Sequence, residues 1–418
     1  MNGYGHGRPL GINGLGRIGK LCVWHHAARR TFPGLVVNVG RAVGRDLDSV
    51  CGVIQNDSTY GNMDRFLFGI SAQPSVRIID RDRNLIEVAG MPVRVLQQAR
   101  NPADIDWRSE SVRVVVDTTG AFDDPTVPET DPKGSLRGHL IAGAEKVIYS
   151  AAFKAPHHVA PDDCVTLIHG INHTVFDPAR HHLISAASCT TTALAHMVKP
   201  VLESMQAANV MTASMSTVHA VTNSQTVLDA VPGAGAKDLR RTRSALNSMV
   251  LTSTNAARAL EEVIPEIREI GFMADSVRIP IPTESLIILN ITFQTRLDAH
   301  GESVINRAAL NEIFRAAGTG SQAGMLVFSD VQNVPKDVMG MRAAVVIEGV
   351  ETHTRTGFVE VDLGSLPGIS ESALAALAQP VIRVPVTHAK IFGWYDNEYG
   401  SYTNMLGDLT VHVAESLP

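Results

Sequence analysis

The chain has 418 residues, 44% of them hydrophobic and 19% charged, which excludes disordered and fibrous classes and allows two domains with substantial cores. Its formal net charge of -6 gives no basic field that would gather nucleic acid or an anionic membrane. No apolar run reaches the length of a membrane span, about 20 residues, and residues 1–9 lack the apolar core of a secretory signal. We therefore expect a cytoplasmic protein without nucleic-acid or membrane partners, in which local contacts hold any anionic ligand.

The first elements of the chain predict a nucleotide site. Residues 10–14 are strand-like, residues 14–19 read GLGRIG, and a helical stretch follows over 20–28. Glycines at 14, 16 and 19 permit a tight turn and close approach to a pyrophosphate, and the helix N-terminus offers free N–H groups. The pattern alone also describes an ordinary strand-to-helix turn, but a second strand follows at the distance of a dinucleotide-binding unit.

The next strands are short and apolar, at residues 35–39, 112–116 and 146–149, and favour a doubly wound parallel domain. The first of them runs on into Arg41, where an NAD-specific site normally carries an acid for the ribose hydroxyls. Two interpretations stay open. Arg41 pairs with the extra phosphate of NADP, or it is solvated and a nearby carboxylate, Asp46 or Asp48, folds back. The segment 117–122 suits a turn beneath the coenzyme.

Beyond residue 188 the pattern changes. A helical run from Cys189 is followed by strand-like residues 210–218 and 286–293, which predicts a second domain of α+β type. The polar segment from 219 to about 251 has no strong pattern of its own, and a loop of that length is usually functional or interfacial.

The four cysteines are Cys22, Cys51, Cys164 and Cys189, without CxxC or metal-ligand spacing, so we expect neither a disulfide framework nor a metal site. Cys189 opens its helix, with Ser188 as the N-cap, and the helix dipole and unpaired N–H groups there favour a thiolate. Composition alone favours the alternative of a buried, inert thiol, because free cysteines are among the most buried residues.

Several longer stretches are more specific. They are GINGLGRIG (11–19), NDSTYG (56–61), GINH (170–173), SAASCTTT (185–192), TVHAVT (217–222), VRIPIP (277–282) and WYDNEYG (394–400). With these motifs in this order, the chain strongly resembles the glyceraldehyde-3-phosphate dehydrogenases from about residue 9 to residue 415.

The resemblance implies an α/β fold with a Rossmann-type, doubly wound dinucleotide-binding domain at 1–187 and an α+β catalytic domain at 188–401. A C-terminal helix, 402–418, would pack back on the first domain, and four copies would form a homotetramer. The implied reaction is the phosphorylating oxidation of D-glyceraldehyde 3-phosphate, or of a related aldehyde phosphate such as erythrose 4-phosphate, with NAD or NADP.

The resemblance also implies residue roles. Cys189 matches the nucleophile, and His219 matches the base that pairs with the thiol and then polarises the hemithioacetal oxygen. Asn397 matches the residue that orients the nicotinamide amide. The other implied coenzyme contacts are Asn13, Gly14, Gly16, Arg17, Ile18, Gly19, Arg41, Thr119 and Gly120.

Two anion sites follow from the same match. Arg278 with Thr222 would bind the substrate phosphate. The attacking inorganic phosphate would be bound by Ser188, Thr190, Thr254 and Arg241. An alternative for Arg241 and its basic neighbours is a solvated or subunit-interface charge run.

The chain departs from the family pattern in length and beside the phosphate site. Extra residues lie near 123–139, 230–236 and 350–387. Ala186 and Thr192 stand where the family has Asn, Asn255 where it has Gly, and Leu251 where it has Pro. Because of these changes, the sequence specifies the identity of the aldehyde and of the acyl acceptor less closely than the type of reaction.

Two other functions compete. Semialdehyde and acyl-phosphate reductases share a Cys–His design but lack the stretch 394–398, which argues against them. A non-catalytic nucleotide-binding protein on the same fold would carry an unreactive Cys189.

Overall fold

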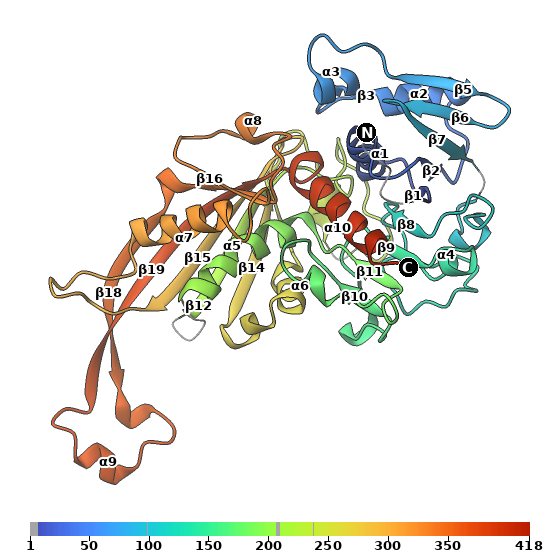
Figure 1. The fold of residues 1–418 in the computed structure, drawn as a ribbon. Helices are drawn as coiled ribbons and strands as arrows, with labels where there is room; N and C mark the ends of the chain where they lie inside the picture. The colour runs from blue at the N-terminus through green and yellow to red at the C-terminus, as the bar shows by residue number, and fades with distance from the viewer. Residues whose placement is uncertain (1–6, 98, 206–209, 237) are drawn as a thin grey trace.

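The computed structural model describes residues 7–418 except 98, 206–209 and 237 (Figure 1). The described residues of the N-terminal part form a nine-stranded sheet in the order β10-β11-β9-β8-β1-β2-β7-β6-β5. Neighbours from β10 to β7 pair in parallel, and β6 and β5 add an antiparallel edge. The strands are β1 (Leu10–Asn13), β2 (Leu35–Asn38), β5 (Val76–Asp80), β6 (Leu85–Val88), β7 (Met91–Leu96), β8 (Val114–Asp117), β9 (Lys146–Tyr149), β10 (Cys164–Thr166) and β11 (Leu183–Ser185).

Strand order reverses beside β1, since the chain first builds outward through β2 and β7 and then returns to β8 on the other side. Ligands of open α/β sheets bind at such a switch point, outside the carboxyl ends of the strands. The sheet is accompanied by α1 (Arg17–Arg29), α2 (Leu47–Gln55), α3 (Met63–Phe68), α4 (Gly138–Ile141), the short ribbon β3 (Asn56–Asp57) and β4 (Gly61–Asn62), and the 3₁₀ turns η1 (Pro102–Asp104), η2 (Pro156–His158) and η3 (His173–Val175).

The C-terminal part is a second, mixed sheet in the order β13-β14-β12-β15-β19-β17-β16, with β18 paired to β19. Its strands are β12 (Val210–His219), β13 (Val250–Thr252), β14 (Phe272–Arg278), β15 (Ser285–Gln294), β16 (Leu326–Ser329), β17 (Val345–Glu348), β18 (His353–Asp362) and β19 (Val381–Tyr395). Its helices are α5 (Cys189–Met205), α6 (Ala256–Val263), α7 (Arg307–Thr319), α8 (Pro335–Val338), α9 (Glu371–Ala375) and the 3₁₀ turns η5 (Leu239–Thr242), η6 (Pro265–Glu269), η7 (Gly349–Glu351) and η8 (Leu363–Ser365).

Buried and partly exposed side chains alternate along the central strand β15, which gives this sheet one apolar face. Every second side chain of β15 is buried, including Ile287, Leu289 and Ile291, and the same core cluster contains Leu194 and Met197 of α5. Helix α5 therefore lies on the sheet (Figure 1).

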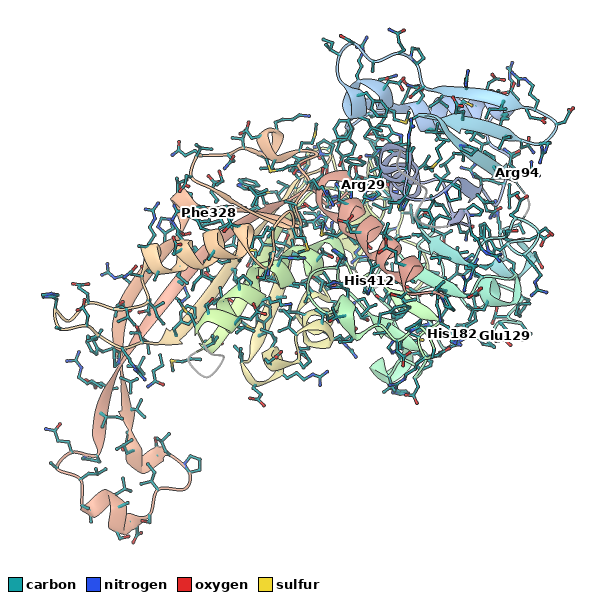
Figure 2. All side chains as sticks on the ribbon, viewed as in Figure 1. Arg29, Arg94, Glu129, His182, Phe328 and His412 are labelled. Carbon is teal, nitrogen blue, oxygen red and sulfur yellow. The ribbon has the colours of Figure 1, made fainter. Side chains whose placement is uncertain are left out.

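The chain end returns to the first domain. A π-helical turn, η9 (Tyr399–Thr403), leads into α10 (Asn404–Glu415), whose Leu406 and Leu409 share a core cluster with Leu21 of α1. His412, labelled in Figure 2, also lies 3.0 Å through Nε2 from the backbone oxygen of His173.

The α/β fold class expected from the sequence is confirmed, with β9 at the predicted residues and β8 shifted to Val114–Asp117. The extra segment 350–387 forms most of an arm in which β18, α9 and the start of β19 project from the body (Figure 1). No helix in the described part of the chain combines the length and the apolarity needed to cross a membrane. The same residues contain no cluster of three or more His, Cys, Asp or Glu suited to a metal ion.

Candidate active site

Cys189 is the first residue of α5 and follows a strained turn at Ala187. Ala187 adopts φ 56°, a left-handed conformation that is uncommon outside glycine. Its N–H donates to the Ser185 hydroxyl at 3.1 Å, and its carbonyl accepts from Tyr402 at 3.2 Å. Ser188 caps the helix, because its Oγ accepts the N–H of Thr191 at 3.1 Å. Hydrogen bonds therefore fix the backbone both before Cys189, at Ala187, and after it, at Thr191.

His219 ends β12 and faces this cysteine. Its Nε2 lies 3.6 Å from the Cys189 Sγ, and its Nδ1 lies 2.7 Å from the backbone oxygen of Ala220. An Nδ1–H that donates to that oxygen leaves the Nε2 lone pair free to accept the thiol proton. The register of the parallel pair β12 and β14 places Arg278 directly beside His219.

Arg278 sets the charge around the pair. One of its guanidinium nitrogens donates at 3.2 Å to the Ala220 oxygen, the same oxygen that accepts the His219 Nδ1–H, so the cation lies directly against the imidazole. Burial lowers the pKa of His219 to about 3, and Arg278 adds to the effect. The imidazole is therefore neutral at pH 7 and able to act as a base.

The thiol is shifted in the opposite direction. Burial raises the pKa of Cys189, while Arg278 and the backbone N–H of Thr190 oppose that rise without cancelling it. The helix N-terminus favours the thiolate, as the sequence indicates, but burial outweighs it. At rest the site pairs a neutral thiol with a neutral imidazole, so ionisation of the cysteine depends on proton transfer to His219.

Tyr395 joins α5 to β12, and the sequence did not point to this residue. Its hydroxyl lies 2.8 Å from the Thr190 Oγ1 and 2.9 Å from the Thr217 Oγ1, and so joins α5 to β12. The Thr190 hydroxyl is thereby oriented by Tyr395, and its expected use as a phosphate ligand stays a prediction. The signal was available in the stretch 394–400, which also contains Asn397.

The structure also gives side-chain contacts for the other residues expected to bind anions. Burial lowers the pKa of Arg278, and the charge of Arg241 lowers it further. Arg241 donates to the Thr252 hydroxyl at 3.1 Å. The Thr222 hydroxyl pairs with Ser224 at 2.9 Å. Thr254 accepts an N–H at the start of α6 at 3.2 Å. Two interacting cations are an arrangement that an anion stabilises.

Asn397 is held by its oxygen. The hydroxyls of Thr283 and Ser285 both donate to its Oδ1 at 3.3 Å, and no described residue accepts a hydrogen bond from its Nδ2. The side chain can therefore donate to a ligand carbonyl while its orientation stays fixed.

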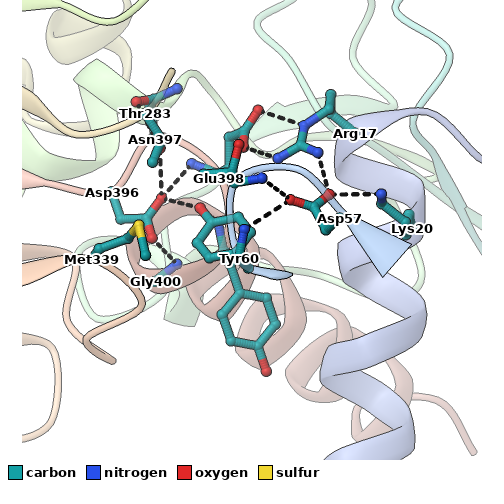
Figure 3. A network of polar contacts seen from close by, with 12 residues as sticks. Arg17, Lys20, Asp57, Tyr60, Thr283, Met339, Asp396, Asn397, Glu398 and Gly400 are labelled. Atoms are coloured by element: carbon teal, nitrogen blue, oxygen red, sulfur yellow. Dashed lines mark hydrogen bonds and ion pairs between the residues drawn. The ribbon is translucent and has the colours of Figure 1, made fainter. Parts of the chain in front are cut away.

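The neighbouring residues join the two domains through a network of charges (Figure 3). Arg17 of α1 binds Asp57 and Glu398, and Lys20 reaches Asp57 at 2.6 Å. Burial opposes ionisation of Asp57, but the hydrogen bonds from Lys20, the Tyr60 backbone and Arg17 lower its pKa to about 2. The Arg17 side chain is engaged here, and the coenzyme contact expected of Arg17 stays a prediction.

Glu284 lies between the two residues that hold Asn397 and was missed by the sequence argument. It is 2% exposed, adopts φ 73°, and neither of its carboxyl oxygens has a hydrogen-bond partner among the described residues. Burial, with the nearby charge of Asp396, raises its pKa to about 9. Glu284 is therefore protonated at neutral pH.

The glycines of the motif 14–19 shape an open pocket at the end of β1. Gly14 has φ 100°, and a Cβ at Gly19 would lie 2.2 Å from the Gly14 oxygen, so both positions require glycine. Gly16 caps α1 without a side-chain hydrogen bond, and a Cβ there would meet nothing within 4 Å. The first N–H groups of α1, those of Arg17, Ile18 and Gly19, have no partner within the helix and follow directly after Gly16, which lines the pocket. The residues present fit a dinucleotide pyrophosphate.

A buried network supports the other wall of this pocket. Asp117 accepts from Asn13 at 2.8 Å and from the Thr119 hydroxyl at 2.7 Å, and it lies 3.0 Å from the His139 Nε2. The Trp107 indole donates to the His139 Nδ1 at 2.9 Å, so Nε2 carries the proton that bonds Asp117. Gly120, with φ 66°, turns the chain after Thr119, which lines the pocket. His139 belongs to an extra segment, and no pattern there pointed to it.

The pocket, of about 550 Å³, continues past β2, where Arg41 lines it. Asp46 caps α2 through the N–H of Ser49 at 3.2 Å, and Asp48 pairs with Arg81 at 2.7 Å. Neither carboxylate lines the pocket in this structure, and the choice between the two interpretations stays a prediction.

Comparison with known proteins identifies this architecture. A family model described as glyceraldehyde 3-phosphate dehydrogenase, NAD binding domain, matches residues 8–125. A second, described as glyceraldehyde 3-phosphate dehydrogenase, C-terminal domain, matches residues 188–362. No residue role follows from these matches alone.

Curated relatives match the chain nearly end to end. The glyceraldehyde-3-phosphate dehydrogenase of Streptomyces coelicolor is 31% identical over 413 residues, covering 98% of this chain and 99% of the relative. Glyceraldehyde-3-phosphate dehydrogenase 2 of Streptomyces arenae is 32% identical over 409 residues, with 98% and 99% covered. The enzyme of Geobacillus stearothermophilus is 30% identical over 406 residues, with 97% and 98% covered. The chain belongs to the glyceraldehyde-3-phosphate dehydrogenase family of oxidoreductases, as a divergent member.

Proposed function

We propose that the protein oxidises D-glyceraldehyde 3-phosphate, or a closely related aldehyde phosphate such as erythrose 4-phosphate, to an acyl phosphate. The reaction would use NAD or NADP, inorganic phosphate and a thioester on Cys189. The observation that carries the proposal is the 3.6 Å approach of the His219 Nε2 to the Cys189 Sγ at the head of α5, with Arg278 beside it.

In the first step His219 takes the thiol proton, and the Cys189 sulfur adds to the aldehyde carbon. The proton passes to the former aldehyde oxygen and gives a hemithioacetal. His219, neutral again, then removes the hydroxyl proton as the carbon–hydrogen bond breaks. A nicotinamide coenzyme held in the pocket would supply the hydride acceptor. The carbon is thereby oxidised to a thioester, and the protonated His219 carries one proton away from the site.

In the second step inorganic phosphate attacks the thioester carbon. His219, neutral again after releasing its proton to solvent, accepts the proton of the phosphate and passes it to the Cys189 sulfur as that sulfur leaves. The backbone N–H of Cys189 and the His219 side chain would stabilise the oxyanion formed in each addition. Arg278, with Thr222, would bind the substrate phosphate. Ser188, Thr190, Thr254 and Arg241 would bind the attacking phosphate, and its site would lie near Asn255, where a side chain replaces the family's glycine.

The coenzyme would lie across the switch point of the first sheet. Its pyrophosphate would accept N–H groups at the start of α1, and the free Nδ2 of Asn397 would orient the nicotinamide amide. The family resemblance adds a homotetramer, which light scattering on the purified protein tests independently of activity.

The test is a rate assay with purified protein, phosphate, either aldehyde phosphate and either coenzyme, followed at the absorbance of the reduced coenzyme. We expect turnover with at least one combination and a loss of at least a thousandfold for Cys189→Ser. The Cys22→Ser variant is the matched control, because Cys22 is buried away from the site and burial raises its pKa to about 12. Absence of turnover in every combination would refute the proposal.

The alternative of a non-catalytic binder is separated by thiol chemistry. An active pair predicts stoichiometric alkylation of Cys189 by iodoacetamide at pH 7.5, slowed by bound coenzyme and slowed strongly in His219→Asn. A binder with an inert thiol predicts alkylation at the rate of the buried Cys22.

A further inference from the structure

Beyond the end of β2, the coenzyme pocket is lined by three cationic side chains that no described residue neutralises. Arg41 follows β2, Arg100 follows β7, and Lys133 belongs to the extra segment 123–139. All three are exposed and line the same pocket. Within the described part of the chain, none of the three side chains has a hydrogen bond or an ion pair, and no Asp or Glu lines the pocket.

Packing fixes where Arg100 lies. A Cβ on Gly40 would come within 2.9 Å of the Ala99 oxygen and 3.1 Å of the Arg100 side chain, so the two segments approach as closely as glycine permits. The Asn38 amide donates to the same Ala99 oxygen at 3.1 Å. The ends of β2 and β7 are thereby held together with Arg41 and Arg100 at one edge.

The turn that carries Lys133 is held just as firmly. Gly134 has φ 88°, and a Cβ there would lie 2.9 Å from both the Phe122 ring and Pro102. The backbone N–H of Lys133 donates to the Asp131 carboxylate at 2.7 Å, so that carboxylate binds the main chain and not the ammonium. The extra segment therefore presents a cation to the pocket from a rigid turn.

The chemistry of this edge suits an anion with more charge than a ribose diol. An acid would bond the two hydroxyls of a ribose, but Asp46 and Asp48 are engaged elsewhere. Arginine forks and a lysine suit a phosphate monoester, and a carboxylate would repel it.

We propose that the coenzyme of this protein is NADP(H), and that Arg41, Arg100 and Lys133 bind its 2′-phosphate. Lys133 is a specificity-determining residue that the extra segment supplies. The inference rests on the proposed function for the presence of a nicotinamide coenzyme in this pocket, but it makes a claim about binding that needs no turnover.

The experiment is calorimetric titration of the full-length protein with NADPH and NADH, and with adenosine 2′,5′-bisphosphate and AMP as the matched pair without nicotinamide. We expect the 2′-phosphorylated member of each pair to bind at least tenfold more tightly. Lys133→Gln, Arg41→Gln and Arg100→Gln should each weaken NADPH binding about 10- to 100-fold, the effect of one lost charge-assisted hydrogen bond. The same variants should change NADH affinity less than threefold.

Arg83→Gln is the control, since it removes the same charge from an exposed turn of this domain that does not line the pocket. Equal affinity for NADPH and NADH, or equal losses for both coenzymes in Lys133→Gln, would overturn the inference. A loss in Arg83→Gln as large as in Lys133→Gln would also overturn it, because a diffuse field would then explain the binding. Aldehyde oxidation with NAD and none with NADP would keep the proposed function and refute this inference. Selective 2′-phosphate binding without aldehyde oxidation would do the reverse.

Discussion

The proposed coenzyme site uses charge in opposite ways at its two ends. At the proposed nicotinamide end, Arg17 and Lys20 are bound to Asp57 and Glu398 in a largely buried network (Figure 3). At the proposed adenosine end, the cations are exposed and face the pocket without acidic partners among the described residues. A buried charge is costly without a partner, whereas an exposed one needs none. The first set holds the domains together, and the second is available to a ligand.

Arg17→Met should give the largest effect on stability. It leaves Asp57 and Glu398 with less compensation inside the protein, and breaking a buried pair costs about 3 kcal/mol. The measurement is urea unfolding at pH 7.5. Arg41→Met at the other end is the comparison and should change stability by less than about 0.5 kcal/mol. Equal effects would contradict the distinction between the two ends.

Glu284→Gln should stabilise the protein at neutral pH. The folded-state pKa of about 9 lies above the usual value of 4.5, so the fold favours the protonated carboxyl, and its cost grows as pH rises from about 4.5 to 9. At pH 7 the difference corresponds to about 3 kcal/mol, reduced by whatever relaxation burial allows. Unfolding measured from pH 5.5 to 8.5 should show a gain that increases with pH. A pH-independent effect would mean that Glu284 is not protonated in the folded state.

Buried histidines should give a smaller, opposite pH dependence. Burial lowers the pKa of His26 to about 3 and that of His196 to about 4, both below the usual 6.5, so the unfolded chain binds more protons. Stability from this source is complete above pH 6.5 and falls as pH decreases toward the folded values. His26→Met should reduce the slope of stability against pH between 6.5 and 5, with little change at pH 8. An unchanged slope would remove His26 from the account.

Asn397→Asp should have the smallest structural effect and a clear functional one. It keeps the oxygen that accepts from Thr283 and Ser285 but removes the Nδ2 donor proposed for the nicotinamide amide. We expect a thermal midpoint within about 2 °C of the parent and a kcat/KM for coenzyme lower by at least tenfold. An unaltered kcat/KM would place the anchor elsewhere.

The sequence predicted those features of the molecule that depend on residues close together in the chain. The glycine motif, the strand at 146–149 and the cysteine at a helix start each depend on neighbouring residues, and each appears where expected. Contacts that depend on how two strands are aligned in the sheet could not be predicted from the sequence. Arg278 meets His219 because β12 and β14 pair in parallel, although the two residues lie 59 positions apart.

Side-chain partners were the least predictable part of the site. Tyr395 and His139 meet partners more than 20 residues away, through the buried networks around Thr190 and Asp117. The balance of burial against the helix N-terminus at Cys189 also needs the packed structure, because the two effects have opposite signs. Lys133 lies in an extra segment, where no family pattern assigns a role to any residue.

The most direct test of the central claim is a single-turnover experiment without phosphate. Purified protein mixed with glyceraldehyde 3-phosphate and oxidised NADP should release about one equivalent of reduced coenzyme per site. Mass spectrometry should find the acyl group on the Cys189 peptide, and added phosphate should remove it and restore turnover. Continuous turnover without phosphate, or a full burst with no acyl group on Cys189, would contradict the proposed thioester mechanism.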